Sequence, residues 1–576
     1  MKYLNSIYIH QTLDFLHRYG LKSVLSKVPE YLMTTRGYQS WRKDHTPSEE
    51  ELAAQRELSV RMTSRPLFSI LVPTYNTDPL QLKQMTESVF SQTYDHWELC
   101  IADGSPKPSS VEQFFQKYAE EQAQGKIRFA AIRNQGIAGN TNAAMALAKG
   151  DYIVLLDHDD LLSPDALYEL AAAVKESPDV DVLYSDEDMV SADGTFLHNP
   201  NFKPDFSPDL LRSCNYITHL YAVKRSLALL AGGFSAECDG SQDYDFTLKT
   251  TERAKSICHI PKVLYHWRVH SNSVAADSSN KTYAYDSAVR ALEQHYERLG
   301  IGACVTKDPQ PGFYLTDYAI TGKHLVSVLM YGCAGCVREE ILDAWKKDTS
   351  YPESKTTTGE QISTALDKRN GSYDIEFPSS LSQASGDFVL VLRHVREITP
   401  DTVRLLLSNC MRQEVGIAVP RILSENGKVV ESGLIFNQAG RILSPFAGKD
   451  AIYPGYHCFA TCQRQISLAG PYCFMSSMEN LRRNWREEKK GNQKIAESTP
   501  TVRMAGFCFR TQADQKLISL IPRACVTLTA KENRNAMAAY KAARPGKLPS
   551  VSSWFKEHPT DPYYTPNFSQ DHPYRF

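Results

Sequence analysis

The stretch Tyr152-Ile-Val-Leu-Leu-Asp157-His-Asp159-Asp160 decides the fold, because a short apolar run ends in three carboxylates within four positions. An apolar run of this length is typical of a strand buried on both faces, as in a parallel sheet covered by helices. Ligands of open α/β sheets bind just beyond the carboxyl ends of such strands. If the chain stays extended, Asp157 and Asp159 point one way and His158 points the other.

Two interpretations of these acids stay open at this point. Carboxylates this close repel one another, and a cation between them removes that cost, so the acids would form a metal site facing an anionic substrate. The alternative is that they cap a helix beginning near Ser163-Pro164.

Strands and helices alternate around this stretch. This alternation predicts a parallel, doubly wound α/β sheet. No glycine-rich phosphate loop of the two common types follows the first strand, so a nucleotide would be held by carboxylates, a metal and backbone groups. The expected strands are 68–72, 97–103 and 127–132, and the expected helices are 80–90, 111–122 and 140–148.

Composition sets wider limits. A chain of 576 residues predicts two or three domains, and a net charge of −2 gives no reason to expect a nucleic-acid partner. The 13 cysteines are scattered, and the lone pair Cys333 and Cys336 is a weak metal signal, so a reduced, cytoplasmic compartment is expected. No apolar run approaches the roughly 18 residues that cross a bilayer, which leaves a soluble protein or one at the inner face of the membrane.

The two ends of the chain differ from its middle. Residues 1–65 predict a helical segment, and its part 8–32 mixes aromatic, aliphatic and basic residues. That mix suits either an amphipathic helix on a membrane surface or a collar packed on the next domain. The segment 531–576 is rich in aromatic residues and proline, and we expect it to wrap as an ordered extension over another surface.

Polar motifs follow the strands in a fixed order between about 68 and 275. Taken together they resemble glycosyltransferase family 2, the inverting transferases with the GT-A fold. One position departs from the family pattern, because Gln242 stands where the family has glutamate. The residues that carry the resemblance are Ser69-Ile-Leu-Val-Pro-Thr-Tyr-Asn76, Asp103-Gly-Ser105, Asn134-Gln-Gly136, Asp157-His-Asp159-Asp160, Gly232-Gly-Phe234, Gln242-Asp243 and Arg268-Val-His270-Ser-Asn-Ser273.

The resemblance implies roles for these residues. Asp243 would be the general base, and Asp157, Asp159 and His270 would hold a divalent metal, Mn²⁺ or Mg²⁺, on the diphosphate of a nucleotide sugar. The implied donor-binding residues are Thr74, Tyr75, Asn76, Asp103, Asn134, Asn140, Asp157 and Arg268.

The residues expected to bind the acceptor are predicted from weaker sequence patterns. Asp186 and Glu187 follow an expected strand of the same sheet, which favours a place in the acceptor or donor pocket over a solvated turn. Trp267 is either a packing residue or an aromatic side chain that stacks on a pyranose face.

The chemistry of transfer fits this set of residues. A divalent ion on hard carboxylate oxygens stabilises the charge of a leaving nucleoside diphosphate. A base takes the proton of the attacking acceptor hydroxyl, which contributes about 10²–10⁴-fold. Direct attack inverts the anomeric carbon and needs no enzyme nucleophile, and the sequence offers no credible nucleophile arrangement.

An internal repeat occupies the second half of the chain. The stretch 148–165 matches 384–401, with Gly150 opposite Gly386 and Asp165 opposite Asp401, an offset of 236 residues in both cases (386 − 150 and 401 − 165). We therefore expect a GT-A glycosyltransferase domain at 66–322 and a second GT-A-like domain at 323–530.

The second copy has lost the chemistry of the first. Arg393 stands at the position of Asp157, Val395 at that of Asp159, and Met504 opposite Asp243. The copy also looks shortened near 350–375. We expect a degenerate domain that supports the first, binds acceptor or mediates assembly, and a basic pocket that holds an anion also stays open.

The expected function is hexosyl or rhamnosyl transfer, by inversion, from a dTDP- or UDP-sugar to a glycan, on a lipid carrier, in bacterial surface polysaccharide synthesis. The motifs around Asp186 and Trp267 resemble those of bacterial enzymes that build such polymers, often with rhamnose. The alternatives are a non-catalytic binding scaffold of a polysaccharide assembly complex and a sugar nucleotidyltransferase, which would want a basic glycine-rich loop where Pro73-Thr-Tyr-Asn76 stands. Membrane contact, self-association and assembly partners stay open.

Overall fold

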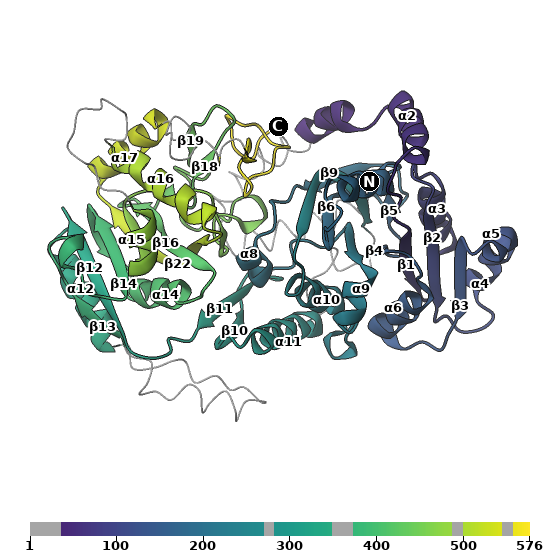
Figure 1. Cartoon of the computed structure of the whole chain (residues 1–576), viewed down its shortest axis with the longest axis horizontal. Coiled ribbons are helices and arrows are strands. Elements are labelled where there is room, and N and C mark those ends of the chain that lie inside the picture. The colour runs from purple at the N-terminus through teal and green to yellow at the C-terminus, as the bar shows by residue number, and fades with distance from the viewer. Residues whose placement is uncertain (1–35, 270–281, 348–372, 486–498, 544–553, 555–556) are drawn as a thin grey trace.

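The computed structural model describes residues 36–269, 282–347, 373–485, 499–543, 554 and 557–576. Two α/β halves lie side by side, the first in purple to teal and the second in green to yellow, and the chain ends between them (Figure 1). The segment 8–32, for which a membrane-surface helix was one interpretation, lies outside the described residues. None of the described helices combines the length and the apolar character that crossing a membrane requires.

The first half is built on one sheet with the strand order β3-β2-β1-β4-β8-β6-β9-β5, and β7 pairs with β6. Its parallel part confirms the expected α/β sheet, but β8 runs antiparallel between β4 and β6, so the sheet is mixed. The strands are β1 (Phe68–Thr74), β2 (Trp97–Asp103), β3 (Ile127–Ala131), β4 (Tyr152–Leu155), β5 (Leu161–Leu162), β6 (Val182–Val190), β7 (Leu197–Asn201), β8 (Tyr221–Lys224) and β9 (Ile257–Arg268).

Helices cover both faces of this sheet, and a hydrophobic core lies on each face. The side chains of β1 alternate between these two cores. Ile70 faces one cluster, which includes Leu82 and Leu167, while Leu71 faces the other, with Ala144 and Phe246. The helices are α2 (Glu49–Val60), α3 (Pro79–Phe90), α4 (Ser110–Phe115), α5 (Ala119–Ala123), α6 (Gly136–Leu147), α7 (Ala166–Glu176), α8 (Pro208–Ser213), α9 (Arg225–Leu230), α10 (Gln242–Thr251) and α11 (Thr282–Leu299).

Local chemistry fixes where these helices begin. The Asp78 side chain accepts a hydrogen bond from Leu80 N (2.8 Å), and Pro79 occupies the first helical position of α3, where a missing N–H costs nothing. Ser48 and Glu51 exchange hydrogen bonds at the start of α2 and satisfy two backbone donors there.

The second half repeats the strand order of the first from β2 to β5, and it adds β20, which pairs with β22. Its sheet has the order β13-β12-β14-β21-β16-β22-β15, with β17 on β16, and β21 is again the antiparallel insertion. The sequence repeat is therefore a repeat of topology. The elements are β12 (His324–Tyr331), α12 (Cys336–Lys347), β13 (Tyr373–Glu376), β14 (Phe388–Arg393), β15 (Val395–Ile398), α14 (Thr402–Cys410), β16 (Val415–Ser424), β17 (Val429–Glu431), β18 (Ile435–Phe436), β19 (Ile442–Leu443), β20 (Arg464–Gln465), β21 (Cys473–Ser477), α15 (Met478–Asn484), α16 (Pro500–Ala513), β22 (Leu517–Leu528) and α17 (Ala530–Ala542).

The shortening expected near 350–375 falls mainly on residues that are not described. β13 supplies the counterpart of β2, and no strand in the described ranges pairs with its outer edge as β3 does with β2.

In both sheets, the same group of hydrogen bonds, called a strand tie, joins neighbouring strands near their amino-terminal ends. In the first, Ser69 Oγ donates to Glu98 (2.6 Å) and accepts from Gly150 N (2.8 Å). In the second, Gly386 N donates to Ser327 Oγ (2.8 Å), and Ser327 Oγ donates to Glu376.

Only glycine fits at the centre of each tie. A Cβ on Gly150 would lie 2.4 Å from Leu67 O, and one on Gly386 would lie 2.5 Å from Leu325 O. The glycines that reveal the repeat in sequence are thus required by close backbone packing.

A buried ion pair joins the two halves. Asp209 of α8 is fully buried and accepts two hydrogen bonds from Arg412, one from its Nη1 (2.5 Å) and one from its Nη2 (2.8 Å). Ser519 Oγ of β22 donates to the same carboxylate (2.6 Å). The guanidinium of Arg412 also lies 4.6 Å from the ring centre of Tyr318.

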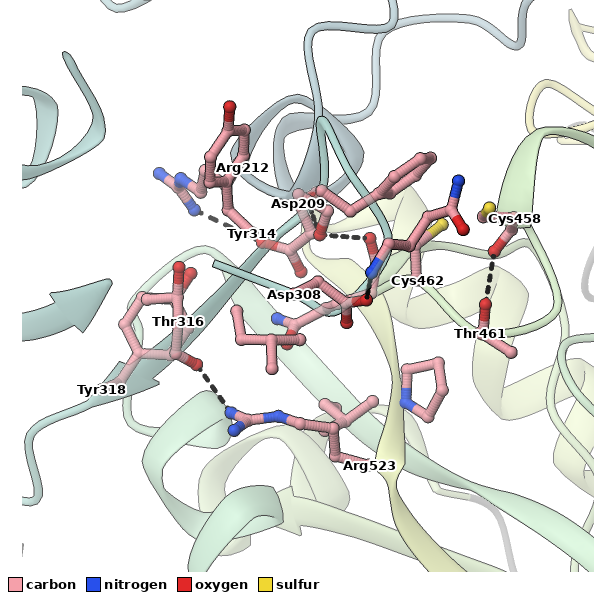
Figure 2. Close-up of a pocket in the computed structure, with 17 residues that line it drawn as sticks. Asp209, Arg212, Asp308, Tyr314, Thr316, Tyr318, Cys458, Thr461, Cys462 and Arg523 are labelled. Carbon is pink, nitrogen blue, oxygen red and sulfur yellow. Dashed lines mark hydrogen bonds and ion pairs between the residues drawn. The ribbon is translucent and has the colours of Figure 1, made fainter. Parts of the chain in front are cut away.

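A two-stranded hairpin, β10 (Ala303–Lys307) and β11 (Tyr314–Tyr318), lies at this junction. A pocket of about 30 Å³, room for about one water molecule, lies there. It is lined by Asp209, the hairpin and residues of the second half (Figure 2). Arg523 Nη2 of β22 donates to Thr316 O of the hairpin (2.9 Å). The hairpin is therefore held by both halves.

The described end of the C-terminal extension is packed as expected. Tyr564 and Phe568 are buried in a cluster with Tyr38, Phe202 and Ile435. Asn567 Nδ2 donates to Asp186 in the first half (2.7 Å). The extension thus joins the segment before β1 to both halves.

We predict that Asp209→Ala destabilises the whole chain, because it leaves the Arg412 guanidinium buried without its carboxylate partner. The expected loss in unfolding free energy is about 3–5 kcal/mol, measured by thermal and urea unfolding. Lys428→Ala is the control, since its pair with Asp450 is exposed, and it is expected to cost less than about 1 kcal/mol. Equal losses of unfolding free energy in the two variants would contradict the role of Asp209 in the buried ion pair.

Candidate functional site

A cavity of about 960 Å³ opens at the carboxyl ends of β1 and β4. It brings together many of the residues expected from the sequence, although they lie far apart along the chain. Those in its wall are Thr74, Tyr75, Asn134, Asn140, Asp157, Asp159, Asp243 and Trp267. Among the described residues expected at the site, Asn76, Asp103, Asp186, Glu187 and Arg268 are not in its wall. His270 lies outside the described residues.

The acids after β4 lie on a turn. β4 ends at Leu155, and Asp160 N donates to Asp157 O (3.3 Å). The expected alternation of side chains is therefore wrong, because the chain leaves the extended conformation, and His158 lines the cavity together with Asp157 and Asp159. The helix-capping interpretation is also wrong, since α7 begins at Ala166.

Asp160 is the buried anchor of this turn. Its Oδ2 accepts from Tyr265 Oη (2.6 Å), and its Oδ1 accepts from Arg268 N (2.7 Å). The Arg268 side chain is itself buried, and its Nε donates to Asp159 O (2.5 Å). Arg268, expected to bind donor, thus shapes the acidic turn from behind.

Three side chains converge where a cation would sit. Ligand atoms of Asp157, Asp160 and His219 all lie within 4.8 Å of one another. Burial and the neighbouring Asp159 raise the pKa of Asp157 to about 6, so the carboxylates are close enough to oppose one another's ionisation.

His219 completes this group of three. Burial lowers the pKa of its imidazole, and its Nδ1 is buried without a hydrogen-bond partner. Two carboxylates with a neutral imidazole are a donor set that fits a divalent cation such as Mn²⁺. Sequence reasoning missed His219 because no strand was expected at β8, and only that strand brings it beside the acidic turn.

Asp243 lies in the first turn of α10 and faces the same cavity. Asn215 Nδ2 donates to its Oδ2 (2.9 Å) and fixes the carboxylate. Burial raises the pKa of Asp243. A carboxylate with a raised pKa is a better proton acceptor.

The side chain of Gln242, the residue that departs from the family pattern, accepts a hydrogen bond from the loop that precedes α10. Its Oε1 accepts from Gly240 N (3.0 Å). Its amide therefore helps to shape the chain that leads into α10.

Asp103 lies beneath the cavity. It is buried and accepts from Thr74 Oγ1 (3.1 Å) and Ser105 Oγ (2.6 Å). Ser105 Oγ in turn accepts from Asn76 N (2.8 Å). Asp103 and Asn76 thus hold the loops that follow β1 and β2, while Thr74 and Tyr75 form the wall.

The two acids assigned to the acceptor side are inside a strand. β6 continues to Val190, so Asp186 and Glu187 neither follow its end nor form a solvated turn. Asp186 accepts from Lys203 N (2.8 Å) and pairs with His259 Nε2 (2.9 Å). Glu187 lies 3.5 Å from Lys203 Nζ. These basic partners allow two acids to be buried in the sheet, and of the three expected acceptor residues Trp267 alone lines the cavity.

Residues 69–221 match the family model described as glycosyl transferase family 2. This segment of the chain is therefore a glycosyltransferase family 2 domain by its sequence pattern. The site described above lies at the carboxyl edge of the sheet of this family 2 domain, which has the GT-A fold.

Curated relatives extend the similarity over both halves. An uncharacterized protein y4gI of Sinorhizobium fredii is 32% identical over 71% of this chain and 47% of its own length. The O-antigen biosynthesis protein RfbC of Myxococcus xanthus is 30% identical over 71% of this chain and 33% of its own length. The chain thus spans less than half the length of each. A chondroitin synthase of Pasteurella multocida is 29% identical over 36% of this chain and 21% of its own length.

Among solved structures, S. aureus TarS 1-349 in complex with UDP-GlcNAc matches with a TM-score of 0.32 and 20% identity, over 40% of this chain and 66% of that one. The mannosyltransferase PcManGT from Pyrobaculum calidifontis, in complex with GDP-Man and Mn²⁺, matches with a TM-score of 0.30 and 21% identity, over 43% of this chain and 70% of that one.

We predict that His259→Gln changes how the stability of the family 2 domain depends on pH. Burial acts to lower the pKa of His259, but Asp186 and Asp205 outweigh it and raise the pKa to about 9. Because this value exceeds that of the unfolded chain, the stabilisation is complete below about pH 6.5 and is lost as the pH rises through about 9.

The melting temperature of the wild type, measured from pH 6 to 10, should therefore fall more steeply than that of His259→Gln. Parallel curves for the two proteins would show that the His259–Asp186 pair does not contribute in this way.

Proposed function

We propose that this protein transfers a sugar, with inversion, from a nucleotide-sugar donor to a hydroxyl of a growing glycan. The observation that carries the proposal is that Asp157 and His219, whose ligand atoms converge with that of the buried Asp160, line the same cavity as the carboxylate of Asp243. The first would hold a divalent metal, Mn²⁺ or Mg²⁺, and the second would be the base.

The donor binds along the carboxyl ends of β1 and β4. Thr74, Tyr75, Asn134 and Asn140 line this side and would hold the nucleoside. The diphosphate lies at the acidic turn, where a bound divalent cation supplies charge stabilisation to the leaving group. His219 is kept neutral by burial, so its ring nitrogen is available as a ligand.

Asp243 takes the proton of the acceptor hydroxyl as that oxygen attacks the anomeric carbon. Asn215 orients the carboxylate through Oδ2. The nucleoside diphosphate leaves from the face opposite the attack, which inverts the configuration without a covalent intermediate.

The names of the relatives point to polysaccharide synthesis. RfbC is named for O-antigen biosynthesis, and other relatives are named chondroitin and hyaluronan synthases. We extend this to the present chain as a role in a bacterial surface polysaccharide, with a dTDP- or UDP-sugar as donor, hexosyl or rhamnosyl transfer, and a lipid-linked acceptor at the inner face of the membrane.

A non-catalytic scaffold is the competing function. The repeat argues against it, since the second half keeps its fold with Arg393 at the position of Asp157 and the buried Met504 opposite Asp243. The repeated fold therefore forms without acids at the positions of Asp157 and Asp243, and catalysis would account for their presence in the first half.

We predict that Asp243→Asn retains donor binding and loses transfer by about 10²–10⁴-fold, because the amide cannot accept the hydroxyl proton. The measurement is release of nucleoside diphosphate in the presence of acceptor glycan, with donor affinity determined by calorimetry. Asp95→Asn is the matched control, since that carboxylate is 62% exposed and lies outside the cavity wall. Near-normal turnover of Asp243→Asn would remove Asp243 as the base.

We also predict that Mn²⁺ strengthens the binding of nucleotide sugars. In a thermal-shift screen with Mn²⁺ or Mg²⁺, the donor should raise the melting temperature by mass action, and excess chelator should reverse that rise. With or without metal, the donor should raise the melting temperature of Asp157→Asn only by the small amount expected for the wild type in excess chelator. An unchanged shift in chelator would contradict the metal assignment.

A further inference from the structure

We propose that the second half of the chain forms the acceptor subsite of the active-site cavity, where its residues His457 and Phe459 bind a pyranose ring of the acceptor glycan. The inference rests on the proposed function and adds to it the part of the chain that selects the acceptor. The sugar-binding wall is defined here as His457 and Phe459 together with Phe313 of the β10–β11 hairpin.

The cavity has two walls of different origin. One wall is the donor side, formed by the carboxyl ends of β1 and β4 and the acidic turn. The other includes residues 312–314 of the hairpin and His457 and Phe459, which come from the degenerate copy. A volume of about 960 Å³ lies near the upper end of about 300–1,000 Å³ for small-molecule sites, as expected of a cavity that holds a donor and part of an acceptor.

The base lines the same cavity as the residues of both walls. Asp243 and the ring of Tyr314 line the same cavity, and Tyr314 stacks on Tyr244, the residue after the base, with ring centres 6.1 Å apart. When an acceptor hydroxyl lies at Asp243, the bound donor occupies the donor side of the cavity next to it. Its sugar ring must therefore extend toward the hairpin and the second half.

The chemistry of the second wall suits an uncharged sugar. One face of a pyranose ring presents C–H groups, and removing that face from water against an aromatic ring is favourable. Phe313 is half-buried and offers aromatic surface, the buried ring of Phe459 reaches the cavity wall from the core, and the exposed imidazole of His457 offers hydrogen bonds to ring hydroxyls.

The backbone at His457 is strained. Its φ is 41°, in the left-handed region that non-glycine residues rarely adopt. Such residues persist when the surrounding structure imposes them, and they gather at ligand-binding sites. Here the strain presents the imidazole to the cavity.

The loop that carries His457 is fixed to the first half. Tyr456 Oη accepts from Phe202 N (2.7 Å) and donates to Pro200 O (3.1 Å). On the other side of the loop, Arg464 Nε donates to Phe459 O (2.8 Å). These contacts hold the second wall at a set position relative to Asp243.

The test measures binding of the full-length protein, with Mn²⁺ and UDP or dTDP, to a printed panel of bacterial surface oligosaccharides. His457→Gly removes the imidazole and relieves the positive φ, so it should not lower the melting temperature. Phe459→Leu keeps an apolar side chain in place of the aromatic ring. Each variant is expected to bind the glycan recognised by the wild type about tenfold or more weakly.

Binding of the nucleoside diphosphate with Mn²⁺ should stay unchanged in both variants. Ile452→Ala is the matched control, because Ile452 is 57% exposed, precedes the same loop and is absent from the cavity wall. Variants that bind the glycan as the wild type does, or a wild type that binds no glycan of the panel, would overturn the acceptor subsite. A wild type that binds neither UDP nor dTDP with Mn²⁺ would instead overturn the proposed function.

Discussion

The pairing of Asp209 with Arg412 is the constraint on which the arrangement of the two halves depends. A carboxylate and a guanidinium are both removed from water, and neither is tolerable there without the other. Each belongs to a different half, and the two hydrogen bonds between them form only when the halves are docked, although Arg212 also lies 3.4 Å from Asp209 and Glu414 lies 3.6 Å from Arg412. Docking then places a loop of the second half against the cavity of the first, and the family 2 domain cannot complete its cavity wall alone.

Sequence patterns predicted most of the fold and about half of the site. The expected strand 97–103 is β2, and the repeated glycines 150 and 386 marked two copies of one topology. The antiparallel β8 was missed because four residues give too short a pattern, and His219 was missed with it. Asp186 and Glu187 were misplaced because acids usually end a strand, whereas their partners His259 and Lys203 come from distant segments that sequence spacing does not connect.

The two copies separate what the fold needs from what the chemistry needs. The ties through Gly150 and Gly386 lie at the amino-terminal ends of the strands, and both copies keep them. At the opposite edge, the acids of one copy are replaced by Arg393 and Val395 in the other, and the same strand order persists. The edge with the candidate site was free to change because backbone packing is secured at the other edge.

The antiparallel insertion has a consequence for the order in which the chain folds during synthesis. β8 begins 66 residues after β4 ends (221 − 155), and β21 begins 80 residues after β14 ends (473 − 393). On the ribosome, the backbone hydrogen-bonding edge of each central strand therefore stays unpaired until its late partner emerges, and pairings this distant in sequence form slowly. The duplication makes the nascent chain pass through this aggregation-prone interval twice.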